Sequence, residues 1–252
     1  MLTDETLEQL ARQYQSNIYP NILREYYQHA FLQTLYQARE AEHLLFKGGT
    51  ALRVIYGSPR FSEDLDFSLA RVRPSHTGTF MEGEWVRVLA DMERMGINVE
   101  IGKKSGTTSG GYYGIAKFQM GTWKSVEISI NVSARRGERR NSEVDNIAGD
   151  FVPTYTVVHL AQYDLVEEKV FGALRERKKP RDFYDLYFML RKGMLEPKQK
   201  RKLSHMKGRI IQDARKINFR GELGAFLPAN QQAIIRNFSR TLEAELNRQT
   251  GD

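Results

Sequence analysis

Hydrophobic residues recur at helical spacing near both ends of the chain. Residues 7–14 carry apolar side chains three or four positions apart, after Thr3 and two acidic residues. This order is typical of a helix start, because an N-cap oxygen and nearby carboxylates stabilise the positive end of the helix dipole. A longer apolar stripe predicts a second helix over 22–38. The same period predicts C-terminal helices over 160–177, 183–191, 197–217 and 228–246.

The middle of the chain alternates between short apolar runs and polar turns, which is typical of strands. Residues 44–46 form an apolar run, and 64–69 alternate so that leucine and phenylalanine share one face while aspartate and serine share the other. Helical patterns over 50–56 and 80–95 are each followed by a glycine. Further strands are predicted over 98–101, 112–120 and 125–132.

These patterns divide the chain into an N-terminal α/β part and a helical C-terminal part. The strand patterns stop near 149–153, and helical patterns follow. We therefore expect an α+β protein with a mixed sheet, N-terminal helices and a helical C-terminal region, with domains 1–150 and 151–252. A chain of 252 residues is long enough to bury most of its apolar surface without disulfides.

The composition excludes several kinds of site. The chain has no cysteine, which excludes disulfides, thiolate zinc sites and cysteine nucleophiles. Its 40% hydrophobic and 27% charged residues are typical of a globular protein and not of a disordered one. No apolar run approaches the roughly 20 residues that cross a bilayer, and the first residues are acidic where a signal peptide would be basic. We expect a cytoplasmic protein with no membrane partner.

Positive charge is concentrated in one stretch. Residues 191–220 hold eleven Lys or Arg against Glu196 and Asp213, a formal charge of +9 in a chain whose total is +7, so the other residues sum to −2. A local positive field suits a polyanion such as RNA or DNA, although a solvated helix face would give the same pattern. A second basic cluster, four arginines within 135–140, follows a predicted strand and suits either RNA phosphates or a solvated turn.

Asp64 and Asp66 stand at i and i+2 on a predicted strand. Both side chains therefore point to the same face, about 7 Å apart along the chain. Two unpaired carboxylates this close repel each other. A hard divalent cation relieves the repulsion, and Mg²⁺ takes oxygen ligands while keeping positions for substrate phosphates. The pair predicts an anchor for a nucleotide–magnesium complex, with an acidic surface strand as the alternative.

Gly48 and Gly49 stand at the junction of a predicted strand and a helix, upstream of the aspartates. Without a Cβ atom the backbone can turn sharply there, and an anion can approach its N–H groups closely. Lys47, Thr50 and Ser62 add a positive charge and two hydroxyls. The stretch predicts a phosphate-binding turn for a nucleotide, with a plain tight turn as the alternative.

Glu127 lies inside the most strand-like run of the chain, between Val126 and Ile128. A glutamate on a half-buried strand is costly unless it is paired or holds a ligand. If this strand neighbours the one with the aspartates, Glu127 adds a third carboxylate, enough for one or two magnesium ions. An exposed position on an edge strand is the alternative.

Three charged residues of the C-terminal part join the candidates. Helical spacing sets Lys169 beside the packed stripe of its helix, and its compact charge suits a phosphate oxygen. Asp182 and Asp185 are three residues apart and share one side of the next helix. Asp182 follows Pro180 near the helix start, so capping and catalysis are equal alternatives there. Asp185 lies one turn further in and is a poorer capping candidate.

Two segments together resemble a known enzyme family. Residues 47–69 read KGGTALRVIYGSPRFSEDLDFSL, and residues 167–190 read EEKVFGALRERKKPRDFYDLYFML. The order of Gly-Gly-Thr, a short helix, Asp-x-Asp and a later strand carboxylate is similar to that of the polymerase-β-like nucleotidyltransferases. The R-x-S-x-D-L-D segment, the helical lysine and the R-D-x-x-D-L segment more closely resemble the AbiEii/AbiGii-type nucleotidyltransferase toxins of bacterial toxin–antitoxin and abortive-infection systems.

The resemblance implies a polymerase-β-like core that transfers a nucleotide from an NTP to RNA, with the 3′ end of tRNA as acceptor and pyrophosphate as product. It also implies Mg²⁺ and a cognate antitoxin protein. Glu127 stands where many relatives have aspartate. Three alternatives stay open: transfer to a protein or small molecule, transfer of the γ-phosphate, and an inert RNA-binding module.

The resemblance also gathers the candidate residues into one site and adds two arginines to it. The expected catalytic residues are Asp64, Asp66, Glu127, Lys169, Asp182 and Asp185, of which the first three are the expected metal ligands. The expected nucleotide-binding residues are Lys47, Gly48, Gly49, Thr50, Arg60, Ser62 and Arg181.

Overall fold

The computed structural model describes residues 3–134 and 141–251, so the arginines within 135–140 lie outside the described residues. The described chain forms two compact units. Residues up to Gly57 and Phe61–Leu160 belong to the first unit, whereas Ser58–Arg60 and the residues from Ala161 onward belong to the second. The division falls after Leu160 and not near 150 as expected, because the segment that precedes Ala161 is a strand of the sheet.

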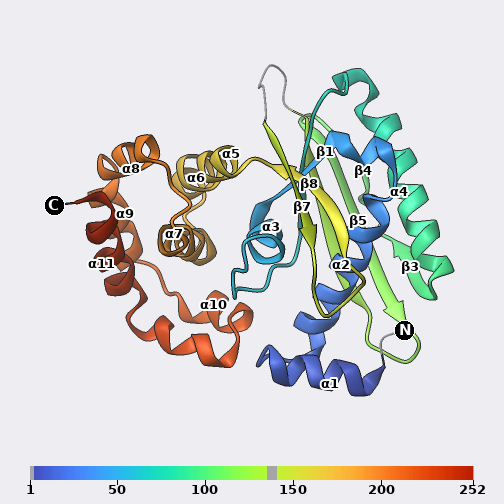
Figure 1. The fold of residues 1–252 in the computed structure, drawn as a ribbon, viewed down its shortest axis with the longest axis horizontal. Coiled ribbons are helices and arrows are strands. Elements are labelled where there is room, and N and C mark those ends of the chain that lie inside the picture. The colour runs from blue at the N-terminus through green and yellow to red at the C-terminus, as the bar shows by residue number, and fades with distance from the viewer. Residues whose placement is uncertain (1–2, 135–140, 252) are drawn as a thin grey trace. The chain divides into compact units, whose positions relative to one another are not determined.

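A mixed β-sheet forms the centre of the first unit (Figure 1). Its strands are β1 (Leu44–Lys47), β2 (Leu65–Leu69), β3 (Ile97–Ile101), β4 (Gly106–Thr108), β5 (Gly111–Met120), β6 (Val126–Ser133), β7 (Ser142–Ile147) and β8 (Tyr155–Leu160). They are arranged in the order β3-β5-β6-β2-β1-β8-β7, with β4 paired to β5. β2 is parallel to β6 and β1 is parallel to β8, whereas the other neighbours are antiparallel. The expected α+β class with a mixed sheet is confirmed.

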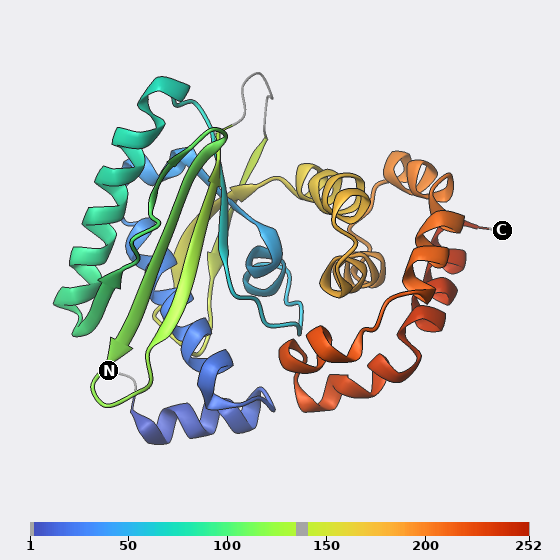
Figure 2. The ribbon, with the colours of Figure 1, turned by 180° about the vertical axis from the view of Figure 1, so that it is seen from behind.

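One face of the sheet is apolar and is covered by helices α2 (Leu23–Leu35) and α4 (Thr77–Arg94) (Figure 2). The alternation of β1 and β2 places Phe46 and Phe67 on this face, with ring centroids 5.6 Å apart. Phe31 of α2 packs against Trp85 of α4, at 5.9 Å between ring centroids. Each large side chain buried here stabilises the fold by about 1.5–3 kcal/mol.

The opposite face of the sheet is polar, and the short helix α3 (Gly48–Val54) lies on it (Figure 2). The aspartates and serine of β2 alternate onto this face, as the sequence predicts. The polar face of β1, β2 and β6 is therefore where the candidate residues of the first unit gather. The remaining helices of this unit are α1 (Asp4–Gln13), η1 (Ile18–Ile22), η2 (Arg39–His43) and η3 (Pro74–His76).

The second unit is helical, as expected. Its elements are α5 (Gln162–Val166), η4 (Glu167–Ala173), α6 (Leu174–Glu176), α7 (Pro180–Lys192), α8 (Pro197–Ser204), α9 (Lys207–Arg215), α10 (Arg220–Phe226), η5 (Ala229–Asn237) and α11 (Phe238–Thr250). η4 has π-helical geometry, and the helix predicted over 197–217 is divided into α8 and α9. Phe238 is buried and packs against Phe219, with 4.7 Å between ring centroids. No helix in residues 3–134 and 141–251 combines the length and hydropathy that a bilayer-spanning helix needs.

Candidate active site

A strip of polar side chains crosses the polar face of the sheet in the first unit. Asp66 of β2 is at its centre, with Lys47 of β1 as its antiparallel partner and Asn131 of β6 as its parallel partner. Asn131 donates its Nδ2 to Asp66 Oδ1 at 3.2 Å. Asp64 directly precedes β2, and Ser129 Oγ of β6 donates to Asp64 Oδ1. The two carboxylates thus share one face, and each accepts a hydrogen bond from β6.

Gly48 packs directly against the carboxylate of Asp66. Its φ of +85° lies in the left-handed region that favours glycine. An ideal Cβ atom at this position would lie 2.1 Å from Asp66 Oδ2, a distance at which one of the two groups must move. Gly49 follows and is buried in the first turn of α3. The glycine pair therefore lets the backbone come closer to a carboxylate than any other residue would allow.

The hydroxyl of Thr50 has a structural partner. Thr50 is buried and donates its Oγ1 to the backbone oxygen of Asp64 at 2.5 Å, which joins α3 to the start of β2. The expectation that Thr50 binds a phosphate stays a prediction, and in this structure its hydroxyl holds the backbone of Asp64. Lys47 reaches across the polar strip and donates its Nζ to Ser133 Oγ at 3.0 Å. Ser62 lies in the segment before β2 and is half-buried.

Glu127 does not join the aspartates, and the expectation of a third converging carboxylate is wrong. In the register of β2 and β6, the residue opposite Asp66 is Asn131. Glu127 lies four residues before Asn131, is exposed, and stands opposite Lys117 in the register of β5 and β6. Among residues 3–134 and 141–251, no group of three His, Cys, Asp or Glu side chains could hold a metal ion. The donor set that remains, Asp64 and Asp66, still fits Mg²⁺, which proteins usually bind through one or two carboxylates plus substrate phosphates.

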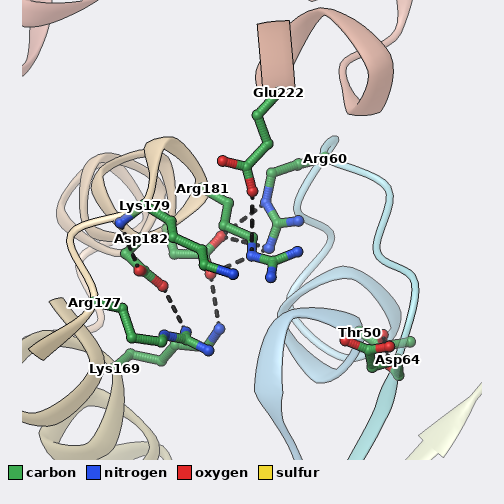
Figure 3. Close-up of polar contacts among 10 residues, drawn as sticks. Thr50, Arg60, Asp64, Lys169, Arg177, Lys179, Arg181, Asp182 and Glu222 are labelled. Carbon is green, nitrogen blue, oxygen red and sulfur yellow. Dashed lines mark hydrogen bonds and ion pairs between the residues drawn. The ribbon is translucent and has the colours of Figure 1, made fainter. Parts of the chain in front are cut away.

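Asp185 is the centre of a buried ion cluster in the second unit. It is only 1% exposed as a side chain, and it accepts hydrogen bonds from Arg60 Nη2 at 2.8 Å and Lys169 Nζ at 2.8 Å. Figure 3 shows Arg60 and Lys169 with these contacts as dashed lines. Burial alone would raise the pKa of Asp185, but the charges of Arg60 and Lys169 outweigh it and lower that pKa below its usual value. Asp185 is therefore an ionised anchor that holds both cations.

The position of Lys169 is set by unusual backbone geometry. The residue lies in the π-helical segment η4, a geometry that is rare in helices and frequent at functional sites. Arg60 comes from the short segment Ser58–Arg60 and is itself buried. The expectation that Arg60 binds the nucleotide stays a prediction, and in this structure its guanidinium is bound to Asp185.

Asp182 caps its helix. Its Oδ2 accepts the backbone N–H of Lys179 at 3.0 Å, and its Oδ1 accepts Arg177 Nη2 at 2.7 Å (Figure 3). Of the two alternatives for Asp182, capping is therefore the one that the structure shows. The neighbouring Arg181 lies with its Nε 3.3 Å from Glu222 Oε1 of α10.

A comparison with known protein families shows which family the chain belongs to. The family described as nucleotidyl transferase AbiEii toxin, of type IV toxin–antitoxin systems, matches residues 30–249. The chain belongs to the AbiEii family. The match spans both the polar strip and the buried ion cluster, and it confirms the resemblance that segments 47–69 and 167–190 indicate. As an AbiEii family member, the chain is a nucleotidyltransferase.

The fold of this AbiEii family chain is similar to two solved structures from Helicobacter pylori. One is a candidate nucleotidyltransferase, with a TM-score of 0.60 and 16% identity over 92% of this chain and 95% of that one. The other is the protein JHP933, with a TM-score of 0.59 and 19% identity over 99% of this chain and 94% of that one. Identities this low show a common fold alone. The chain matches none of the curated proteins.

The partners of the two aspartates in the AbiEii family chain were not predicted as site residues. Ser129 and Asn131 alternate onto the same face of their strand as Glu127, and only Glu127 was singled out because it carries a charge. Which of the three lies beside the aspartates depends on the register of β2 and β6. A strand pattern alone does not reveal the register.

Proposed function

We propose that this AbiEii family nucleotidyltransferase transfers a nucleoside monophosphate from an NTP to an RNA acceptor and releases pyrophosphate. The proposal rests on one arrangement, in which Asp64 and Asp66 share a face of β2 and Gly48 packs against Asp66. Two carboxylates beside a glycine, which has no side chain, are suited to a nucleotide that arrives with a divalent cation.

Asp64 and Asp66 are the residues that would hold Mg²⁺. When bound, the metal would offset the charge of the phosphates and lower the pKa of an acceptor hydroxyl. Ser129 and Asn131 each donate one hydrogen bond to these carboxylates, which fixes their orientation. Thr50 supports the same strand through the backbone of Asp64.

The phosphates of the NTP would contact the chain around the glycine pair. Lys47 supplies a positive charge on the same face as Asp66, and Gly48 and Gly49 leave the backbone accessible to an anion. Ser62 would add a hydroxyl donor to these phosphate contacts.

The resemblance also gives the second unit a part in activity. We propose that Lys169, whose compact charge suits a phosphate, and Arg181 both contribute to activity. Asp185 and Arg60 are then positioning residues, because Asp185 binds both Arg60 and Lys169 inside the unit.

The RNA acceptor is inferred from charge and from the family. Residues 191–220 run from the end of α7 through α8 and α9 to the start of α10, and most of their Lys and Arg side chains are exposed. At least four of these cations have acidic partners, namely Arg191 with Glu245, Lys202 with Glu167, Arg209 with Asp213 and Arg215 with Glu243. Surface pairs of this kind contribute little to stability and leave the local charge positive. The tRNA 3′ end is the acceptor that the resemblance favours. A cytoplasmic site of action and a cognate antitoxin complete the proposal.

Label transfer tests the proposed activity. Purified protein is incubated with Mg²⁺, total tRNA and each α-³²P NTP in turn, and the RNA and protein fractions are then separated. We expect label in tRNA with the wild type and none with Asp66→Asn. The matched control is Asp91→Asn, which makes the same change on α4, on the other face of the sheet, and should keep wild-type transfer.

The other outcomes of this experiment would argue for a different acceptor, for a different reaction or against any transfer activity. Label in protein alone would replace the RNA acceptor with a protein, and transfer of γ-label without α-label would indicate a kinase. No label in any fraction, with the wild type folded, would overturn the proposal.

A further inference from the structure

A pocket in the second unit is built from parts of five helices. It has a volume of about 350 Å³ and is lined by residues of η4, α6, α7, α8 and α9. The floor is apolar, since Leu174, Phe183 and Ile210 are buried core residues. Phe171 of η4 also lines the pocket and is only half-buried, so part of its ring faces the space. An apolar floor with an accessible aromatic ring is not needed to bind a simple inorganic anion.

The walls of the pocket are basic. Four cations line the pocket, whereas two carboxylates lie near them: Asp213 in the lining and Glu167 next to Lys202. Lys202 Nζ lies 3.9 Å from the centre of the Phe171 ring, a cation–π contact. The positive surplus is therefore held directly around the aromatic face. The four cations are Arg175, Lys178, Lys202 and Arg209.

The backbone at Lys178 is shaped to bring this side chain to the pocket. Lys178 has a φ of +51°, in the left-handed region that few residues other than glycine adopt. Its Nζ lies 2.9 Å from Asp213 Oδ2, and Arg209 Nε lies 3.9 Å from the same oxygen. One carboxylate thus holds two cations at the wall. A conformation of this kind costs free energy and persists only where the surrounding structure imposes it.

We propose that this pocket binds one nucleotide of the RNA acceptor, with its base against Phe171 and its phosphates on the surrounding cations. Unpaired RNA bases are recognised by stacking on aromatic rings and arginine planes, and phosphates by Lys and Arg. The pocket offers both within one space that is large enough for a base and its sugar. An acidic peptide would use the cations but not the flat ring. The inference rests on the proposed function in one respect, namely that the acceptor is RNA.

Binding measurements on the full chain test the role of the ring. Fluorescein-labelled total tRNA is titrated with protein without NTP, and affinity is read by anisotropy. Phe171→Ala should weaken binding about tenfold to hundredfold, as expected for the loss of one stacked base, whereas Phe171→Trp should bind like the wild type. The matched control is Tyr19→Ala, since Tyr19 also has a lysine over its ring, Lys124 at 5.1 Å, but lies outside this pocket. This control should bind like the wild type.

The salt dependence of binding separates stacking from charge. Arg175→Gln should weaken binding and lower the slope of log affinity against log salt by about one. Phe171→Ala should leave that slope unchanged. Thermal unfolding of each variant shows whether it is folded, and Phe171→Trp tests the ring if Phe171→Ala is unstable.

Several results would overturn the inference. Wild-type affinity of folded Phe171→Ala would do so, as would equal weakness of Phe171→Trp and Phe171→Ala. Polyglutamate that competes with tRNA for the wild type but not for Phe171→Ala would assign the pocket to an acidic peptide instead. If label transfer fails while RNA binding depends on Phe171, the proposed function falls and the pocket assignment stands. If transfer succeeds and Phe171→Ala binds normally, only the pocket assignment falls.

Discussion

Gly48 and Asp66 are so close that position 48 has no room for a side chain. A Cβ atom on Gly48 would lie 2.1 Å from Asp66 Oδ2, and the φ of +85° at Gly48 is itself unfavourable for other residues. Gly48, in the proposed phosphate-binding turn, and Asp66, a candidate metal ligand, therefore depend on each other for their positions. Moving either one moves the other.

Gly48→Ala should abolish most activity. The added methyl group must displace the Asp66 carboxylate or the turn, and a misplacement of about 1 Å at a reacting site can cost on the order of 10²-fold in rate. The assay is the initial rate of label transfer, with a thermal unfolding curve for each variant. Gly83→Ala is the matched control, since a Cβ at this α4 position meets nothing within 4 Å, and it should keep the wild-type rate. A folded Gly48→Ala variant with normal activity would contradict the assignment.

Asn131→Ala should weaken metal-dependent activity without unfolding the protein. The change removes the hydrogen bond to Asp66 Oδ1, and loss of an outer partner of a metal ligand typically costs about 10–100-fold in metal affinity or activity. The measurement is activity as a function of Mg²⁺ concentration, where the half-maximal concentration should rise. Asn98→Ala, an exposed change on β3, is the control. An unchanged Mg²⁺ dependence would show that Asn131 does not orient the carboxylate.

Glu127→Gln should leave activity within about twofold of the wild type. Glu127 is exposed and stands opposite Lys117 in the strand register, away from Asp66. Surface substitutions of this kind usually change stability by no more than about 0.5 kcal/mol. The same label-transfer assay checks this, with Asp66→Asn as the inactive reference. A loss comparable to that of Asp66→Asn would restore Glu127 as a metal ligand and would require a register different from the one observed.

Much of the fold follows from local sequence patterns. β3, β5 and β6 lie where the β-rich runs predict them, because alternating apolar residues must face a packed core. β7 was not predicted, since its residues are nearly all exposed at the edge of the sheet and carry no apolar alternation. β8 was not predicted either, and its residues fall in the expected C-terminal domain, because only its pairing with β1 shows that it belongs to the sheet.

The site could be predicted only as far as it is local in sequence. The aspartate pair and the glycine turn lie within one short segment, so spacing and alternation are enough to place them on one face. The partners of Asp66 depend on strand register, which is a long-range property. The same holds for Arg60 and Asp185, whose contact joins positions 125 residues apart. The pattern contained the right residue types, and only the tertiary structure shows which ones meet.

Lys169→Met should lower activity while the fold persists. Asp185 keeps its two-point contact with Arg60 when Lys169 is removed, so the carboxylate stays paired. If the role that the resemblance assigns to Lys169 is right, loss of its charge should cost on the order of 10²–10³ in rate. Lys103→Met, an exposed change in the turn after β3, is the control. Wild-type transfer by a folded Lys169→Met variant would remove this lysine from the activity.

Asp185→Asn should destabilise the second unit strongly at neutral pH. The substitution leaves Arg60 and Lys169 without the buried charge that compensates them, and breaking a buried pair from one side typically costs about 3–5 kcal/mol. Urea unfolding followed by far-ultraviolet circular dichroism measures the change. Asp91→Asn is the control, because its exposed pair with Arg94 should contribute less than about 1 kcal/mol.

The stability that Asp185 provides should depend on pH in a defined direction. Its pKa is lower in the folded protein than in the unfolded chain, because Arg60 and Lys169 outweigh the effect of burial. The unfolded state therefore binds the proton more readily. The stabilisation by ionised Asp185 is complete above the pKa of Asp185 in the unfolded chain, about 4, and it is lost as the pH falls through the pKa of the folded protein. The difference in unfolding free energy between the wild type and Asp185→Asn should shrink as the pH is lowered from 5 to about 2. A difference that stays constant over this window would mean that Asp185 is not ionised in the folded protein.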